Sequence, residues 1–383
     1  MDFELPEELA LLKRNVRRFV DSELIPIERH TNSYRLEPGL AHTLGEKAKA
    51  LGLWLYDVPE EFGGQGFGML ARVIVWEELS RSAALPSRAP HIFGPDVSPI
   101  LYQLDGEMRE KYLLPVLRGE RKSCFAQTEP DAGSDPGGMR TTAIRDGGMY
   151  VINGSKRFIT GADVADFAQV FAKTDPGKGS RGGISAFIVD MDTPGVTLGR
   201  PADLMIDDKP YEITFDNVRV PVSHRVGAEG AGFAQAQGWL NAGRIRHGAR
   251  SSGVMERCLE LAVSYAKQRK TFGEPLAQRQ TVQEMLVDSH LELHQLRLMV
   301  YHAAWKADRG EDVRAEAYMV KTFGDERSFR AADRCMQIHG GMGLSKELPI
   351  ERFFRDQRSM MITEGPNEVL RSALARLILQ SYC

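Results

Sequence analysis

Apolar residues recur at helical spacing through the first third of the chain. Between residues 6 and 30, Leu12, Val16 and Phe19 fall on one face of a helix. Similar patterns predict further helices over residues 40–51, 69–84, 95–104 and 107–118. We therefore expect residues 1–122 to form an α-helical domain.

The pattern changes at about Cys124. Short runs of Val, Ile, Phe and Thr, broken by Gly, Asp and Pro, are typical of strands. Candidate strands cover residues 149–156, 167–173, 184–190, 196–198 and 212–220. Asn153-Gly154 predicts a tight turn within the first of these candidates. Short strands at this spacing predict an antiparallel barrel or sandwich, which we place at residues 123–230.

The helical period returns in the last part of the chain. Long helices are predicted over residues 232–268, 279–308, 313–338 and 367–380. Helices of this length with short connections favour a helical bundle, which we place at residues 231–383.

Composition and charge are those of an ordinary globular protein. Of the 383 residues, 42% are hydrophobic and 26% are charged. The net charge of −3 gives no reason to expect nucleic acid or an anionic membrane as a partner. No apolar run approaches the ~18 residues of a membrane span, and the acidic N-terminus lacks the features of a signal peptide. The four cysteines have no paired spacing, which indicates a reducing compartment, so we expect a soluble, cytoplasmic protein.

Two histidines, His290 and His294, stand four residues apart on one predicted helix, a spacing that can hold a metal ion. Leu291 occupies the position where a zinc protease motif requires Glu. Two packed or solvated histidines are therefore the favoured interpretation, and we expect no metal site.

One carboxylate, Glu364, stands in a turn sequence, Thr-Glu-Gly-Pro-Asn, that precedes an apolar-periodic run. We expect it on a short loop at the start of a helix. Met360, Met361 and Ile362 precede it, so the loop begins in apolar surroundings. A carboxylate that is shielded from water has a raised pKa and can act as a general base near neutral pH. The alternative is a solvated surface glutamate.

Three further stretches each allow two interpretations. Residues 124–135 predict a strand and a tight glycine-containing turn, which either binds a polar ligand through backbone N–H groups or is an ordinary capped loop. Phe158 beside Thr160 either stacks on a ring or belongs to the core. Residues 268–276 read by default as a surface loop, although the guanidinium of Arg269 suits a pyrophosphate.

Together these stretches resemble the signatures of the acyl-CoA dehydrogenases, which are FAD-dependent. The matching residues are Thr128-Glu129-Pro130 with Gly133-Ser134-Asp135, Arg269 with Phe272-Gly273, the run from Gln337 to Gly343, the run from Glu351 to Asp356, and Glu364-Gly365. They occur in the family's order, and the resemblance runs from about residue 6 to residue 380. It implies a multidomain α+β fold with an α-helical N-domain, a β-barrel or sandwich middle domain and a C-terminal four-helix bundle.

The resemblance also implies roles for individual residues. Glu364 corresponds to the base that removes the α-proton of an acyl-CoA thioester. Pro366 stands where the family usually has Thr, which affects a flavin hydrogen bond and not the base. Some members keep their base immediately before the arginine that corresponds to Arg244; here that position is Gly243, which leaves Glu364 as the single candidate. The implied substrate contacts are Ser134, Asn241, Arg244, Glu364 and Gly365. The implied FAD contacts are Phe125, Gln127, Thr128, Gly133, Ser134, Phe158, Ile159, Thr160, Arg269, Phe272, Leu276, Gln280, Gln337, Ile338, Gly340, Gly341, Pro366 and Glu368.

The implied reaction is dehydrogenation of an acyl-CoA to a trans-2-enoyl-CoA, with an electron-transfer flavoprotein as acceptor. The FAD site is expected to be shared between chains of a homo-oligomer, which we expect to be a tetramer. An acyl-CoA oxidase, a non-oxidative acyl-CoA flavoenzyme and a catalytically silent flavin- or CoA-binding protein remain as alternatives. The acyl group is not specified: Arg88 lies near where members that use dicarboxylyl-CoA place an arginine, but the register differs and a surface arginine is favoured.

Overall fold

A computed structural model describes residues 4–31, 34–85, 92–95 and 97–381. The chain divides into two compact units. The helical unit comprises Met1–Glu60, Gly64–Pro90 and Asn241–Cys383, and the β unit comprises Glu61–Gly63 and His91–Leu240.

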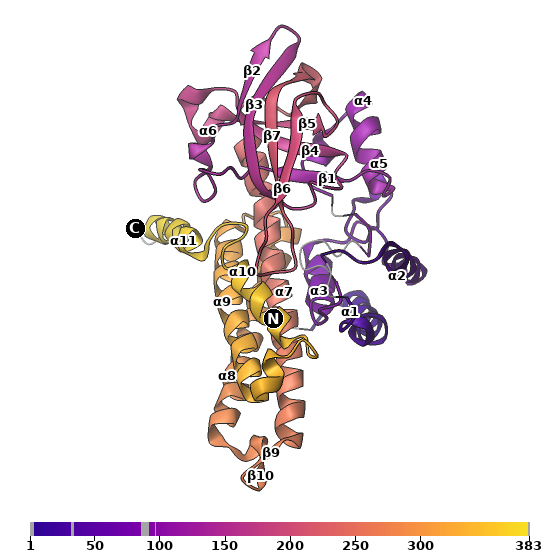
Figure 1. Ribbon diagram of the computed structural model, residues 1–383, viewed down its shortest axis with the longest axis vertical. Helices are drawn as coiled ribbons and strands as arrows, with labels where there is room; N and C mark the ends of the chain where they lie inside the picture. Colours follow the sequence, from indigo (N-terminus) through magenta and orange to yellow (C-terminus); the bar gives the residue numbers. More distant parts are fainter. Residues whose placement is uncertain (1–3, 32–33, 86–91, 96, 382–383) are drawn as a thin grey trace. The chain divides into compact units, whose positions relative to one another are not determined.

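Helices from both ends of the chain build the helical unit (Figure 1). Val73 and Trp76 of the early helix α3 share one apolar core with Ile245 and Leu296 from the long helices α7 and α8. Burial of these periodic faces against one another is what stabilises the separate segments as helices. The helices are α1 (Glu7–Phe19), α2 (Pro38–Ala50), α3 (Met69–Leu79), α7 (Gly232–Gln268, in this unit from Asn241), α8 (Gln280–Asp308), α9 (Arg314–His339), α10 (Ile350–Met360) and α11 (Asn367–Ser381).

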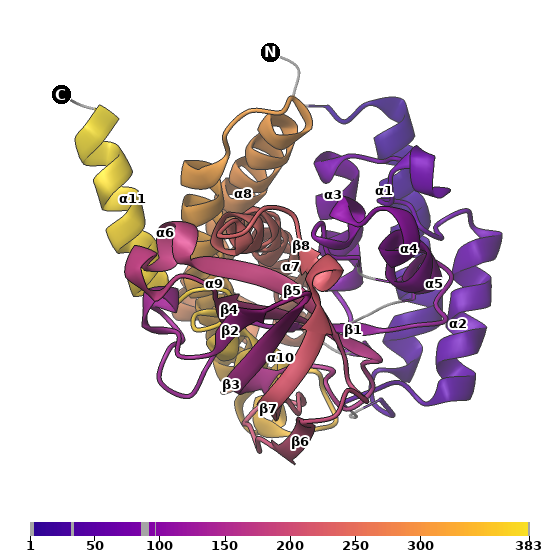
Figure 2. The same cartoon turned by 90° about the horizontal axis from the view of Figure 1, so that it is seen from above.

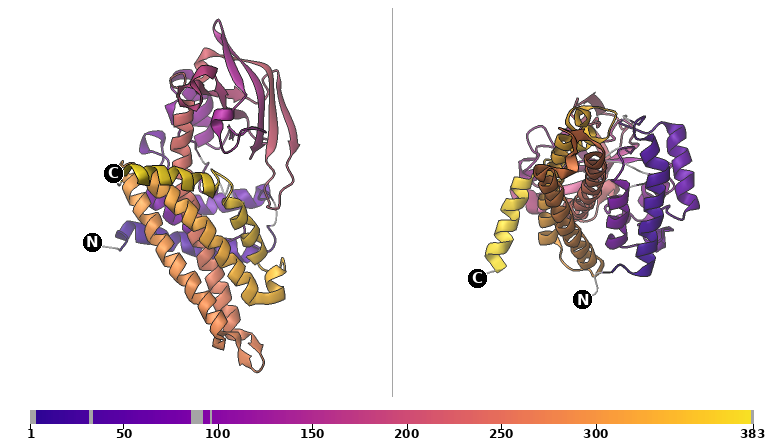
Figure 3. Two further views of the ribbon diagram at one scale, coloured as in Figure 1. Left: turned by 90° about the vertical axis from the view of Figure 1, so that its left-hand side faces the viewer. Right: turned by 90° about the horizontal axis from the view of Figure 1, so that it is seen from below.

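A second core of the helical unit joins α7, α9 and α10, and includes Cys258, Cys335 and Phe353. The long helices α7 and α8 are connected by a small hairpin of β9 (Lys270–Thr271) and β10 (Glu274–Pro275), seen at the end of the two orange helices in Figure 3.

The β unit contains a single eight-stranded sheet with the order β6-β7-β3-β2-β4-β5-β8, and β1 pairs with β4. Figure 2 shows β3, β7 and β6 next to one another. Its core includes the aromatic rings of Tyr150 and Phe187, which meet edge to face with centroids 4.9 Å apart. The strands are β1 (Ser123–Ala126), β2 (Thr142–Asp146), β3 (Met149–Ile159), β4 (Phe167–Lys173), β5 (Ile184–Asp190), β6 (Val196–Pro201), β7 (Tyr211–Pro221) and β8 (Arg225–Val226), with short helices α4 (Gly106–Met108), α5 (Leu114–Leu117) and α6 (Ser180–Gly183).

The predicted fold class is confirmed: helical segments at both ends of the chain flank a β-sheet segment. The four long C-terminal helices agree with the predicted ranges to within one residue at each end. The sheet is not wholly antiparallel, however, because β1 runs parallel to β4, and β2 meets β4 in a parallel register.

The prediction of a turn at Asn153-Gly154 is wrong. Strand β3 continues through both residues to Ile159, and the register with β7 shifts between Ile152 and Gly154. Gly154 has φ = 147°, and a Cβ there would collide with Thr141. The glycine therefore serves a β-bulge, where an irregular backbone passes close to a neighbouring segment, instead of a hairpin.

One helix prediction is wrong, and one helix of the structure had no prediction. Over residues 95–104, the described residues contain only a short 3₁₀ turn at Leu101–Gln103, and Pro99 accounts for this because proline disrupts a helix interior. Helix α10 was not predicted. Its buried face includes Arg352, Asp356 and Gln357, so the apolar period is interrupted on the side that packs inward.

Candidate active site

Glu364 lies in the segment 361–366 between α10 and α11, on a loop before a helix as its turn sequence predicted. Its backbone is left-handed, with φ = 55°, and Gly365 follows with φ = 99°. A left-handed backbone is unfavourable for a residue with a Cβ and persists only where the surroundings fix it. The segment is tied at its far end by a hydrogen bond of 3.1 Å from the backbone N of Asn367 to the carbonyl of Met361.

Lys321 of α9 holds both ends of this loop. Its Nζ donates to the backbone carbonyl of Met360 (3.0 Å), to Oδ1 of Asn367 (3.1 Å) and to Oδ2 of Asp325 (2.8 Å). The side chains of Lys321 and Asp325 are both fully buried. A buried ammonium group requires such acceptors, so Lys321 fixes the last residue of α10 and the first residue of α11, between which Glu364 lies.

Two basic side chains of α7 contact the carboxylate of Glu364. The Oε1 atom lies 3.3 Å from Nη2 of Arg246 and 3.5 Å from Nε2 of His247. The guanidinium of Arg246 lies 4.9 Å from the ring centroid of Trp76, on α3. The side chain of Glu364 is only 17% exposed, so these interactions are shielded from solvent.

Arg244 holds the backbone of the same loop. Its Nε donates to the carbonyl oxygen of Glu364 (3.1 Å), and its Nη1 donates to Oδ1 of Asn241 (2.8 Å). The guanidinium also lies 5.2 Å from the ring centroid of Tyr318. Burial lowers the pKa of Arg244, although Tyr318 and Glu364 act in the opposite direction. The structure thus brings together four of the predicted substrate residues: Asn241, Arg244, Glu364 and Gly365.

Gly243 faces the carboxylate of Glu364. A Cβ at this position would overlap Oε2 of Glu364. The sequence showed that residue 243 cannot be a base, and the geometry adds that any larger side chain there would displace Glu364.

Arg246, His247, Asp325 and Lys321 were not among the predicted site residues. Their signal in the sequence was weak but present. Lys321 and Asp325 are separated by one helical turn in the buried part of α9. Arg246 and His247 belong to a stretch of α7 in which basic residues recur, at Arg244, Arg246, His247 and Arg250. Buried charged residues are uncommon without a partner, so such positions point to a polar network.

In the β unit, the predicted flavin-binding segment after β1 is held by a buried ion pair. Nζ of Lys156 lies 2.8 Å from Oε1 of Glu129 and donates to the carbonyl of Gln127 (3.2 Å). Glu129 also accepts from the backbone N–H groups of Arg140 (2.6 Å) and Thr141 (3.0 Å). Burial lowers the pKa of Lys156 to about 8, while Glu129 acts to raise it.

The two stretches of the β unit that were predicted to bind the flavin lie side by side. The backbone N of Arg157 donates to the carbonyl of Thr128 (2.8 Å), which links β3 to the segment after β1. Phe158 is 47% exposed and has φ = 59°, so it is not a core residue. Phe125 packs on Trp239 with ring centroids 4.2 Å apart, and Thr160 donates to Asp208 (3.0 Å). Ile159 is buried, whereas Gly133 and Ser134 are exposed.

In the helical unit, the hairpin after α7 and the end of α9 lie together. Leu276 packs against the apolar cluster that contains Ile338, and Tyr265 stacks on His339 with ring centroids 4.4 Å apart. Phe272, at the hairpin tip, is 98% exposed. The polar or glycine residues predicted to bind FAD here are also exposed, namely Arg269, Gln280, Gln337, Gly340 and Gly341, and so is Glu368 at the start of α11, while Pro366 is half-buried.

Other candidate residues lie elsewhere. His290 and His294 are both exposed on α8. Arg88 lies outside the described residues. No helix among residues 4–31, 34–85, 92–95 and 97–381 is long and apolar enough to cross a membrane.

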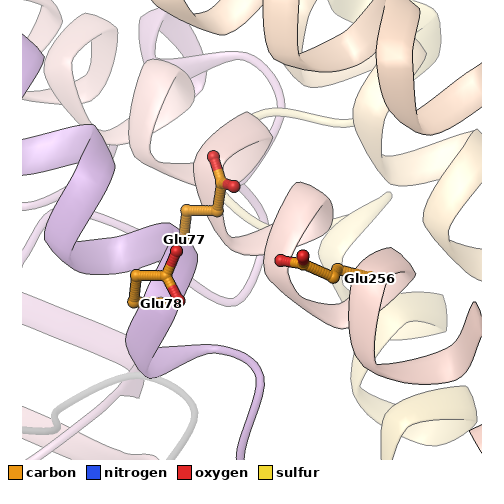
Figure 4. Close-up of side chains that lie close together, drawn as sticks. All are labelled: Glu77, Glu78 and Glu256. Carbon is orange, nitrogen blue, oxygen red and sulfur yellow. The ribbon is translucent and has the colours of Figure 1, made fainter. Parts of the chain in front are cut away.

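Three carboxylates, Glu77, Glu78 and Glu256, gather within the helical unit (Figure 4). Lys13 and Arg297 pair with Glu77, and Arg17 bridges Glu78 (2.8 Å) and Glu256 (2.7 Å). These cations already neutralise the cluster, which is therefore an ion-pair network joining α1, α3, α7 and α8.

The chain matches three family models along its length. They are described as the N-terminal domain, the middle domain and the C-terminal domain of acyl-CoA dehydrogenase, and they match residues 6–120, 124–218 and 230–379. The chain belongs to the acyl-CoA dehydrogenase family and is an oxidoreductase of that family.

Among its curated relatives is the (R)-benzylsuccinyl-CoA dehydrogenase of Thauera aromatica, which is 39% identical, with 99% of this chain and 97% of the relative covered. The 3-(aryl)acrylate reductase of Clostridium sporogenes (strain ATCC 15579) is 38% identical, with 98% and 99% covered.

Solved structures of the same fold include the butyryl-CoA dehydrogenase of Megasphaera elsdenii (33% identity, TM-score 0.87, 99% of this chain and 100% of that chain). PigA with FAD and proline gives a TM-score of 0.89 at 32% identity, with 99% of both chains covered. A chain from work on the electron transferring flavoprotein of Acidaminococcus fermentans gives 0.89 at 33% identity, with 99% and 100% covered.

Proposed function

We propose that this protein binds FAD and oxidises an acyl-CoA thioester to a trans-2-enoyl-CoA, with Glu364 as the base. The observation that carries the proposal is the geometry of Glu364: a carboxylate on a left-handed loop residue, little exposed, with Gly243 leaving the space that it occupies. A positioned base in a shielded site can remove the weakly acidic proton next to a thioester.

The residues around Glu364 then have distinct tasks. Lys321 and Arg244 fix the loop backbone, and Arg246 and His247 direct the carboxylate. The backbone N–H of Glu364 would donate to the thioester carbonyl and stabilise the negative charge that develops there. Asn241, Arg244 and Gly365 are the nearest candidates to contact the substrate beside the base, and Ser134 would contact the CoA moiety.

The residues available for the cofactor fit FAD. The β unit offers an exposed aromatic ring, Phe158, beside the turn that contains Thr128 and Ser134. The helical unit offers an exposed arginine, Arg269, an exposed phenyl ring, Phe272, and a glycine-containing helix end, which suit a pyrophosphate and an adenine. When bound, the flavin supplies the acceptor for the hydride that leaves the β-carbon.

The predicted partners belong to the same proposal. The exposed hairpin at Phe272 and the exposed residues Gln337, Gly340 and Gly341 near the end of α9 support an FAD site completed by a second copy of the chain, as in a tetramer. An electron-transfer flavoprotein is the proposed electron acceptor. The acyl group would be identified by a panel of acyl-CoAs that includes linear, aryl-substituted and dicarboxylic members.

The test of the base is Glu364→Gln. This variant should fold and bind FAD and acyl-CoA, yet the rate of flavin bleaching should fall by at least ~10²–10⁴-fold, because the amide cannot accept the α-proton. Anaerobic rapid mixing with the best substrate of the panel measures this rate.

Flavin bleaching in Glu364→Gln at a rate close to wild type would show that another residue is the base. Oxygen consumption under steady state separates a dehydrogenase from an oxidase. Wild-type protein whose flavin no acyl-CoA bleaches would support a silent flavoprotein instead.

A further inference from the structure

His247 lies between two carboxylates in the helical unit. Its Nε2 is 3.5 Å from Oε1 of Glu364, and its Nδ1 is 3.5 Å from Oδ1 of Asp325. The side chain of His247 is 2% exposed, and Asp325 is fully buried. Among the described residues, neither Nδ1 of His247 nor Oδ1 of Asp325 has a hydrogen-bond partner, so these two buried atoms face each other.

The charged groups around this array come from three elements. Arg246, on α7 beside His247, contacts Oε1 of Glu364, and Arg244, also on α7, contacts the carbonyl of Glu364. On α9, Lys321 contacts the other oxygen of Asp325. The loop before α11 contributes Glu364 itself. Asp325 is thus balanced by Lys321, and Glu364 is balanced by Arg246.

The number of protons on the ring decides what the array can do. A neutral imidazole carries one N–H and therefore can donate to only one of two carboxylates. The other contact would bring a lone pair against an anion among nearly fully buried side chains. A doubly protonated ring donates to both, and an opposite charge within about 4–6 Å favours the ionised form of a carboxylate.

We propose that His247 is a positioning residue that, oriented by Asp325, donates Nε2–H to Glu364 and so keeps the base ionised and aimed. The proposal rests on the proposed function of Glu364. In the reaction the C–H bond at the α-carbon breaks and Glu364 takes the proton, while His247 keeps its Nε2–H and stabilises the carboxylate before and after each turnover.

The experiment separates proton removal from oxidation. A 3-thia-acyl-CoA has sulfur at the β-position and no hydride to transfer, so its α-hydrogens exchange with D₂O only through the base. Mass spectrometry gives the exchange rate of the FAD-loaded protein across pH 4–9. In His247→Gln, which keeps an N–H donor without the charge, we expect the acid limb of the profile to move up by about one pH unit or more. Below that limb the rate should fall about ten-fold for each unit of the shift.

Asp325→Asn tests the other contact. Asn retains an oxygen that accepts from Nδ1–H but lacks the charge that stabilises a doubly protonated ring, so the acid limb should move in the same direction. The matched control is Ser328→Ala. Ser328 is also buried on α9, but its hydroxyl bonds to Ser251 (3.2 Å) and Gln357 (2.7 Å), and its profile should equal that of the wild type.

If the acid limb of the pH profile is the same in folded His247→Gln as in the wild type, the proposal is wrong, because Gln then performs the same function as His247. If neither the wild type nor Glu364→Gln exchanges α-hydrogens, the proposed function of Glu364 is wrong instead.

A second measurement does not depend on turnover or on the folding of His247→Gln. In protein labelled with ¹³C-histidine, the chemical shift of one imidazole resonance should change in Glu364→Gln relative to the wild type, because its anionic partner is gone. If no histidine resonance responds to Glu364→Gln, the proposal is wrong.

Discussion

At the scale of single residues, Gly243 is constrained by the side chain of Glu364. It lies in the middle of a long helix, where glycine is usually less favourable than alanine by about 1 kcal/mol. The space in front of it is filled by the carboxylate of Glu364. Helix stability favours alanine at this position, whereas the observed position of the Glu364 carboxylate requires glycine.

The variant Gly243→Ala tests the effect on helix stability and the effect on the position of Glu364 separately. We expect unchanged or slightly raised thermal stability and normal FAD content, because alanine favours the helix, but flavin reduction should be slower by at least about ten-fold, because the methyl group displaces Glu364. Stopped-flow reduction and thermal unfolding measure these quantities.

Gly238→Ala, in the same helix with open space in front of its Cβ, should leave the reduction rate unchanged. Equal rates in both variants would show that the position of Glu364 tolerates the additional methyl group.

At the scale of elements, the pairing of β3 with the segment after β1 depends on the buried Lys156–Glu129 pair. Burial lowers the pKa of Lys156 to about 8 from an ordinary value of 10.5. Between these two values the unfolded chain binds more protons than the folded protein, so stability rises with pH. The destabilisation that this lysine causes is fully present below pH 8 and is relieved toward pH 10.5.

The prediction concerns the difference in melting temperature between the wild type and a double variant, and how that difference changes with pH. The melting temperature of the wild type should rise, relative to that of Lys156→Met/Glu129→Gln, as pH increases from 8 to 10. The double variant carries no charge at either position, and other alkaline effects cancel in the comparison. Calorimetry at several pH values tests this, and a relative loss of wild-type stability over the same interval would contradict the lowered pKa.

At the scale of the whole molecule, the phenyl ring of Phe272 is almost fully exposed at the tip of the β9–β10 hairpin. Such exposure indicates that another molecule covers this surface. Phe272 has φ = 50°, so its backbone is also held in a conformation that a side chain disfavours. A second copy of the chain with its FAD would cover the ring.

Phe272→Ala and Arg269→Ala should each lower FAD retention on gel filtration and leave the helix content of the chain intact. Ile144→Ala is the control, because Ile144 is also strongly exposed but lies on β2. Light scattering gives the assembly state, and a fully flavinylated monomer would refute the shared site.

The sequence alone determined the long C-terminal helices and the loop position of Glu364, the proposed base. The periodicity of the long C-terminal helices sets their ends to within one residue, and the turn around Glu364 places that residue before a helix. These features are local, because a helix period and a turn depend on residues close together in the chain.

Only the tertiary structure decided what surrounds Glu364, the proposed base. Asn153-Gly154 forms a bulge instead of a turn because of Thr141 and β7, and α10 is a helix whose inward face is partly polar. His247, Asp325 and Lys321 acquire a role only when α7, α9 and the loop before α11 meet. A buried charge is tolerated where its partners are supplied from other elements, and no local pattern records which elements those are.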